Sequence, residues 1–208
     1  MLLTSIICQM DIAKVFSDEQ WNGYHIVSPT WYIVDSGYQN GAFFPVIMKK
    51  GEQNVLCVLE NKEGAWLIAF TNEHALYSGD TLPNNVTYYI NPDAVNIYDD
   101  YKQDFDIFYE YGSPLHNIKM ICYFFAYINK QWRLRSIQII HPEIEGSYVG
   151  GKDYRETYIR PSDGFLTYSY TLNEKDVLPN NVLEYSSSYL LKDFDIDSIP
   201  LSYGDSPF

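Results

Sequence analysis

The sequence predicts a mainly β protein, made of antiparallel hairpins with a few short helices and arranged as two tandem related lobes. Short runs of aromatic and β-branched residues alternate with Gly- and Asn-containing turns, which is the pattern of successive hairpins. Aromatic residues make up 17% of the chain, including 20 tyrosines, and such residues favour strands. In addition, short motifs recur in the same order in the two halves, which indicates a duplication.

The duplication rests on four pairs of motifs, of which Leu-Pro-Asn-Asn-Val is repeated without change. The paired segments are 82–86 and 178–182, 104–107 and 193–196, 111–114 and 203–207, and 71–74 and 172–175. We therefore predict an N-terminal appendage at 1–30, a first β-rich copy at 31–115 and a second at 116–208. A copy of roughly 90 residues is small for independent stability, so we expect the two copies to pack as one unit.

The predicted strands follow the apolar runs, and the predicted turns follow the Gly, Asn, Asp and Pro clusters. The strands of the first copy are 31–34, 42–48, 55–59, 65–70 and 86–90, and those of the second are 118–128, 131–140, 154–160, 165–171 and 182–185. Capping residues and apolar spacing predict short helices at 11–20, at 91–98 and at 189–194. Trp66 and Trp132 each follow a tight turn, and we predict both as core anchors.

Three segments, at 56–70, 131–136 and 190–200, carry a resemblance to a known group of domains. They read Leu-Cys-Val-Leu-Glu-Asn-Lys-Glu-Gly-Ala-Trp-Leu-Ile-Ala-Phe, Gln-Trp-Arg-Leu-Arg-Ser and Leu-Leu-Lys-Asp-Phe-Asp-Ile-Asp-Ser-Ile-Pro. In these motifs the chain resembles uncharacterised extracytoplasmic β-rich repeat domains of low-GC Gram-positive bacteria, which occur within lipoproteins and larger envelope proteins. The resemblance covers roughly two thirds of the chain. It implies export and a β-rich fold, and it supplies no catalytic residues.

Charge and composition exclude several classes of protein. The net charge is -13, from 27 acidic and 14 basic residues, so the chain lacks the cations that nucleic-acid binding requires. No apolar run reaches the ~18–20 residues that a membrane-spanning helix needs. The first eight residues lack the basic region of a secretory signal. A disulfide between Cys57 and Cys122 is one alternative, and two buried thiols are the favoured one.

No pattern in the sequence indicates catalysis or a cofactor. The four histidines stand at no metal-ligand spacing, and neither a nucleophile elbow nor a phosphate loop is present. Asp193, Asp195 and Asp197 alternate as in a calcium loop, but Ser198 and Gly204 stand where that loop needs Gly and Glu. We favour exposed aspartates that alternate with buried apolar residues. The sequence therefore predicts no enzyme, no metal site and no cofactor.

The candidate binding residues are arginines and tyrosines of the second copy: Arg133, Arg135, Tyr158, Tyr168 and Tyr170. Alternation places Arg133 and Arg135 on one strand face, opposite Trp132 and Leu134. The same rule places Leu166, Tyr168 and Tyr170 together on the next hairpin. Arg and Tyr together are suited to recognition of a glycan or a protein. The alternative is an ordinary strand face, with these side chains in the core or in cross-strand pairs.

These observations favour a non-enzymatic binding module of a bacterial envelope or secreted protein, located outside the cytoplasm. Because no leader is recognisable in the sequence, a cytoplasmic location is the alternative. Its partner is a glycan or a protein. A purely structural spacer domain is the first alternative. A polysaccharide hydrolase that works through two carboxylates is the second, although no motif singles out such a pair.

Overall fold

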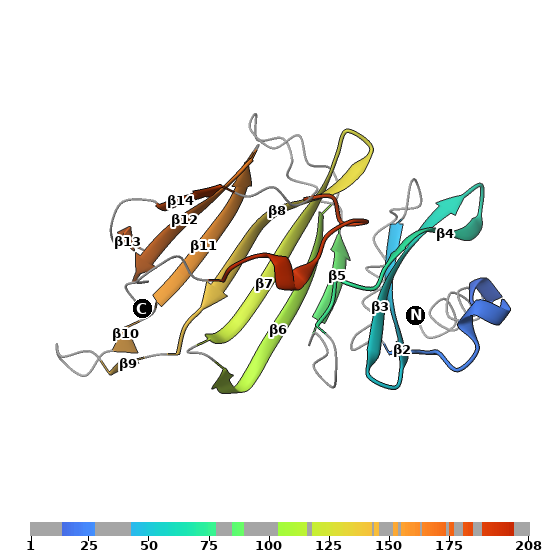
Figure 1. Cartoon of the computed structure of the whole chain (residues 1–208), viewed down its shortest axis with the longest axis horizontal. Coiled ribbons are helices and arrows are strands. Elements are labelled where there is room, and N and C mark those ends of the chain that lie inside the picture. Colours follow the sequence, from blue (N-terminus) through green and yellow to red (C-terminus); the bar gives the residue numbers. More distant parts are fainter. Residues whose placement is uncertain are drawn as a thin grey trace.

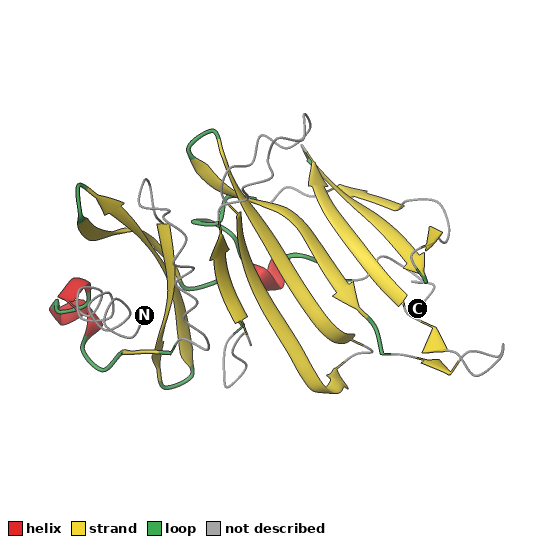
Figure 2. Ribbon diagram, turned by 180° about the vertical axis from the view of Figure 1, so that it is seen from behind, coloured by secondary structure: helices red, strands yellow, loops and turns green. Residues whose placement is uncertain are grey.

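The structure is a computed structural model of the whole chain. It describes residues 14–27, 43–77, 85–89, 104–115, 118–142, 144–145, 152–153, 155–162, 164–173, 175–176, 181–184 and 189–201. These residues form a four-stranded sheet, an eight-stranded sheet and a two-stranded ladder, all antiparallel, together with two short 3-10 helices (Figures 1 and 2). The prediction of a mainly β fold is confirmed.

The small sheet has the strand order β1-β2-β3-β4. Its strands are β1 (His25–Ile26), β2 (Phe43–Lys50), β3 (Gln53–Lys62) and β4 (Ala65–Asn72). The turn between β3 and β4 places Glu63 and Gly64 at positive φ, 53° and 90°. Two residues at positive φ match the twist of a hairpin, as the Asn-Lys-Glu-Gly cluster predicts.

The large sheet has the strand order β13-β12-β11-β8-β7-β6-β5, with β14 paired to β12. Its strands are β5 (Asn85–Tyr89), β6 (Asp104–Leu115), β7 (Ile118–Ile128), β8 (Gln131–Ile140), β11 (Arg155–Ser162), β12 (Phe165–Leu172), β13 (Lys175–Asp176) and β14 (Asn181–Glu184). The separate ladder joins β9 (Ile144–Glu145) to β10 (Lys152–Asp153). Asn129 and Lys130, both at positive φ, make the tight turn between β7 and β8.

A C-terminal strap, defined as residues 189–201, lies across one face of the large sheet, where Figure 1 shows it in red. Its apolar side chains Leu191, Phe194, Ile196 and Ile199 are all buried. Between them, Asp193, Asp195 and Asp197 are exposed, and a carboxylate oxygen of Asp195 accepts the backbone N–H of Asp197 at 3.0 Å at the start of η2 (Ile196–Ser198). The predicted alternation of exposed aspartates with buried apolar residues is therefore confirmed here.

One apolar core joins the two sheets and the strap. It contains Phe43, Ile47, Leu56 and Val58 of the small sheet, Ile107, Tyr123, Phe125 and Ile137 of the large sheet, and Phe194 of the strap. A second core lies on the other face of the small sheet, under Trp21 of η1 (Glu19–Trp21). The predicted appendage thus contributes to the small sheet through Trp21 and through β1. Burying a large aromatic side chain contributes about 1.5–3 kcal/mol, so both cores stabilise substantially.

The strap corrects one prediction. A helix was expected at 189–194, yet Leu134 N–H donates to Tyr189 O at 2.8 Å and Leu191 N–H donates to Trp132 O at 2.9 Å. The first half of β8 has a free edge, because β11 pairs only with Ile137–Ile140 of that strand. Pairing with this edge satisfies the strap backbone better than one helical turn, in which few backbone bonds form.

Other predictions have mixed outcomes. The described sheets divide between β4 and β5, so β5 and β6 of the predicted first copy belong to the large sheet; the duplication itself stays a prediction. No part of β6 was predicted as a strand. The predicted strand 31–34 and helix 91–98 lie outside the described residues. Trp132 is a buried anchor as predicted, whereas Trp66 is half-buried against the second core.

Candidate functional site

A cleft of about 290 Å³ lies between the small sheet, the β7–β8 hairpin and the strap. Its apolar lining comes from Phe43, Phe70, Tyr127, Trp132 and Leu190. Its polar lining comes from Glu60, Lys130, Gln131 and Lys192. A cleft with an apolar floor and a few polar groups at the rim is the usual form of a site for a small ligand, and this volume is near the lower end of that class.

Three aromatic rings from different strands line the floor of the cleft, where Tyr127 is half-buried and Phe43 and Trp132 are 8% and 5% exposed. The ring centroids of Phe43 and Tyr127 are 4.8 Å apart, those of Phe43 and Trp132 5.6 Å, and those of Tyr127 and Trp132 5.3 Å. Tilted and edge-to-face pairs of this kind each contribute about 0.5–1.5 kcal/mol beyond the burial of their area. Because Phe43 is on β2 and the other two rings are on β7 and β8, the floor also joins the two sheets.

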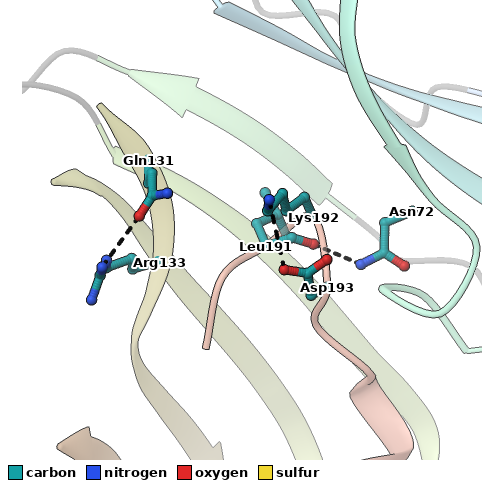
Figure 3. A network of polar contacts seen from close by, with 6 residues as sticks. All are labelled: Asn72, Gln131, Arg133, Leu191, Lys192 and Asp193. Atoms are coloured by element: carbon teal, nitrogen blue, oxygen red, sulfur yellow. Dashed lines mark hydrogen bonds and ion pairs between the residues drawn. The ribbon is translucent and has the colours of Figure 1, made fainter. Parts of the chain in front are cut away.

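The strap fixes one wall of the cleft, and Asn72 fixes the strap. The Asn72 side-chain amide donates to Leu191 O at 2.6 Å (Figure 3). It also donates to Phe194 O at 2.7 Å. Its side-chain oxygen accepts the backbone N–H of His74 at 2.7 Å. One buried residue at the end of β4 therefore holds the strap against the small sheet.

The rim of the cleft carries charges of both signs. A carboxylate oxygen of Glu60 lies 2.9 Å from Lys62 Nζ. Lys192 Nζ lies 3.9 Å from a carboxylate oxygen of Asp193 (Figure 3). These two side chains are 55% and 53% exposed. Burial raises the pKa of Tyr127, and the nearby Glu60 raises it further while Lys62 opposes the rise. The phenol therefore stays neutral at physiological pH and offers one hydroxyl to a ligand.

The predicted binding residues do not meet in one place. Tyr168 and Tyr170 are 0% and 1% exposed on the core face of β12, and Tyr168 donates to Pro200 O at 2.7 Å. This corrects the expectation that these two tyrosines present a surface to a ligand. Alternation places Arg133, Arg135 and Tyr158 on the opposite face of the large sheet from Trp132 and Leu134, which are both buried.

Tyr158 belongs to a polar network on that opposite face. Gln138 Nε2 donates to Glu156 at 2.9 Å and to the Tyr158 hydroxyl at 3.0 Å, and this hydroxyl donates to Glu156 at 2.9 Å. Thr171 adds a longer contact to the same carboxylate, 3.4 Å. The Arg160 guanidinium lies 5.4 Å from the centre of the Tyr158 ring. Glu156 is 8% exposed, so the network satisfies a buried carboxylate.

Of the arginines on this face, Arg133 lies nearest to the cleft. Its guanidinium donates to Gln131 Oε1 at 3.2 Å (Figure 3), and Gln131 is part of the cleft rim. Arg133 therefore holds a cleft residue in place through one hydrogen bond. Arg135 is exposed at the bulge between Phe124 and Phe125, where the register of β7 and β8 shifts.

Sequence reasoning missed most of the cleft residues. Phe43, Glu60, Tyr127 and Lys192 stand on four segments far apart in the chain, and no spacing along the sequence connects them. Trp132 was recognised as an anchor but not as part of a site. An aromatic residue in a strand is a weak indicator of a binding site, because such residues more often belong to the core than contact a ligand.

The described part of the chain offers no second site for redox or metal chemistry. Cys57 and Cys122 are both buried free thiols, so the alternative of a disulfide between them is wrong. No cluster of three metal-ligating side chains occurs among the described residues. No described helix is long and apolar enough to cross a membrane.

Comparison with known proteins adds no relative. Scans against protein-family models, curated proteins and solved structures each found no match to this chain.

Proposed function

We propose that the chain is a non-enzymatic binding module whose inter-sheet cleft holds a glycan residue. The observation that carries the proposal is the floor of three mutually packed rings, Phe43, Tyr127 and Trp132, under a polar rim. A sugar ring has an apolar C–H face that packs on aromatic rings, and hydroxyls around its edge that need polar partners. At the rim, Gln131, Glu60 and the lysines supply both donors and acceptors.

The size of the cleft favours a glycan over a protein partner. A stable protein interface buries about 800 Å² on each partner, which calls for a broad surface. A cleft of about 290 Å³ instead suits one end of a chain or a short branch. The site is also pre-organised, because the strap and the hairpin that form its walls are hydrogen-bonded to each other, and this lowers the entropy cost of binding.

The resemblance to envelope domains of low-GC Gram-positive bacteria extends the proposal to location. We place the module outside the cytoplasm, in a cell-envelope or secreted protein, where polysaccharides are the abundant ligands. The net charge of -13 disfavours contact with nucleic acid or with anionic lipid.

A structural spacer is the second candidate function. It is supported by the bonds of Asn72 and His74 to the strap, which tie the two sheets into one unit. A two-carboxylate hydrolase is weaker, because Glu60 is the one carboxylate among the described lining residues and it pairs with Lys62.

The test is a glycan array of neutral and acidic glycans, followed by isothermal titration of the glycans that bind. We expect saturable binding that Tyr127→Ala weakens by tenfold or more, since this half-buried ring is lost from the floor. Tyr158→Phe, on the opposite sheet face, is the matched control and should bind as the parent chain does. If no glycan on the array binds, the glycan proposal fails and the spacer becomes the better account.

A further inference from the structure

We infer that the cleft selects a sugar that carries a negative charge, a carboxylate or a phosphate ester, through Lys130 and Lys192. This inference rests on the proposed function and names the class of glycan that the site takes. Lys130 comes from the β7–β8 turn and Lys192 from the strap, so the two lysines line the cleft from two different walls.

Both lysines are available to a ligand. Within the described residues Lys130 makes no ion pair, and its side chain is exposed at the hairpin tip. Lys192 contacts Asp193 at 3.9 Å, at the outer limit of an ion pair, with both side chains more than half exposed. Exposed pairs of this kind contribute about 0–1 kcal/mol, so an anion in the cleft can displace Asp193 at little cost.

The acidic group of the cleft does not cancel this positive charge. Glu60 already pairs with Lys62 at 2.9 Å, and its residual charge is therefore reduced. Two exposed lysines at one cleft are unusual in a chain whose net charge is -13, because the overall field repels anions. The two lysines thus oppose, at the cleft, the general electrostatic preference of the molecule.

The aromatic floor argues against the opposite choice, a cationic ligand. A cage for a quaternary ammonium group surrounds the cation with separated ring faces. Here the centroids of Phe43, Tyr127 and Trp132 are 4.8–5.6 Å apart, so the rings fill the space between themselves. The two lysines would also repel such a ligand.

The experiment compares neutral sugars with derivatives of the same sugars that carry an anionic group at C6. Methyl glucoside and methyl glucuronide, methyl galactoside and methyl galacturonide, and the 6-phosphates of glucose and galactose are titrated by calorimetry, at low salt and at high salt. We expect the charged member of at least one set to bind about tenfold more tightly than its neutral partner at low salt, with the difference shrinking at high salt as screening sets in. The carboxylate and phosphate arms show which anion is preferred.

Two variants test the assignment to these residues. Lys130→Gln and Lys192→Gln should each lose most of the preference for the charged sugar while retaining affinity for the neutral one. Lys175→Gln is the matched control, because this exposed lysine is on β13 at the far end of the large sheet. Circular dichroism of each variant confirms that it is folded.

The possible failures are distinguishable. Neutral and charged sugars that bind equally would overturn the charge preference and leave the glycan-binding proposal intact. Equal loss of preference in Lys175→Gln would also overturn it, because the effect would then be a general one of net charge. Absence of binding by every sugar in these sets and on the array would overturn both proposals.

Discussion

Single residues join the parts of this molecule, and Asn72 is the clearest case. It is 5% exposed, and its one side chain satisfies two strap carbonyls and one backbone N–H. Its role could not be read from the sequence, since an Asn near a strand end is also typical of a turn. The buried polar partners that distinguish these cases lie about 120 residues away along the chain.

The substitution Asn72→Ala should reduce the free energy of unfolding by about 2–4 kcal/mol. It removes the Asn72 donor from the carbonyls of Leu191 and Phe194, and Leu191 O then keeps the longer bond of 3.4 Å from Phe194 N–H; a buried group left unsatisfied costs about 1–3 kcal/mol. Urea unfolding followed by tryptophan fluorescence measures the change. Thr71→Ala, at the neighbouring exposed position of β4, is the control and should change stability by less than about 0.5 kcal/mol. Similar midpoints for the two variants would show that Asn72 does not hold the strap.

For the tyrosines and arginines, the sequence predicted which side chains share a strand face but not which face is buried. Alternation correctly placed Leu166, Tyr168 and Tyr170 on one face of β12, and Arg133 opposite Trp132. It did not show which face of β12 is buried, because Phe165 puts a large apolar side chain on the other face, where it is 42% exposed. One large apolar residue on a face that otherwise carries Thr and Ser weakens the contrast between the two faces.

At the scale of elements, the hairpins were predictable and the connecting segments were not. The turns Asn129–Lys130 and 61–64 are predictable from their own residues, and the strands that they join are found where they were predicted. Strand β6 was missed because Gly112, Ser113 and Pro114 indicate a turn when read locally, whereas the structure accommodates them in a strand whose register shifts between Glu110 and Leu115. The pairs on either side, Glu110 with Met120 and Leu115 with Ile118, keep the strand in the sheet, and residues 111–114 form the irregularity between these pairs.

The strap also shows that neighbouring strands can override a local sequence pattern. The segment 104–107 and its repeat 193–196 share the sequence Asp-Phe-Asp-Ile, yet the first begins β6 and the second leads into η2. Both bury the Ile, at 0% exposure for Ile107 and 2% for Ile196. The apolar pattern therefore predicts the burial of Ile in both segments, while the neighbouring strands determine the backbone conformation.

At the scale of the whole molecule, the core contains several groups whose charged forms it excludes. Burial raises the pKa of Cys57 from 9.0 to about 12 and that of Tyr77 from 10.0 to about 12. Burial likewise raises the pKa of Cys122, Tyr109 and Tyr123. Tyr77 and Tyr123 also share a hydrogen bond of 2.6 Å between their hydroxyls.

These shifts predict that the protein loses stability in alkali. The thiol and the phenols ionise in the unfolded chain from about pH 9–10, whereas the folded chain keeps them neutral until about pH 12, so the stability is fully present below pH 9 and falls as pH rises through this window. Urea midpoints measured from pH 7 to 11 check the slope. Cys57→Ala removes one of the groups and should flatten the decline above pH 9. A urea midpoint that stays constant up to pH 11 would show that the fold does not keep these thiols and phenols from ionising.

The central claim is that the cleft between the two sheets is where a glycan binds. Chemical-shift mapping by NMR of the labelled chain, titrated with the tightest-binding sugar from the array, tests it most directly. We predict shifts concentrated at Lys130–Trp132 and Leu190–Lys192, on the two walls of the cleft, with little change at Gln138, Glu156 and Tyr158. Shifts centred on the Tyr158 network, with the cleft unaffected, would contradict the claim and move the site to the opposite face of the large sheet.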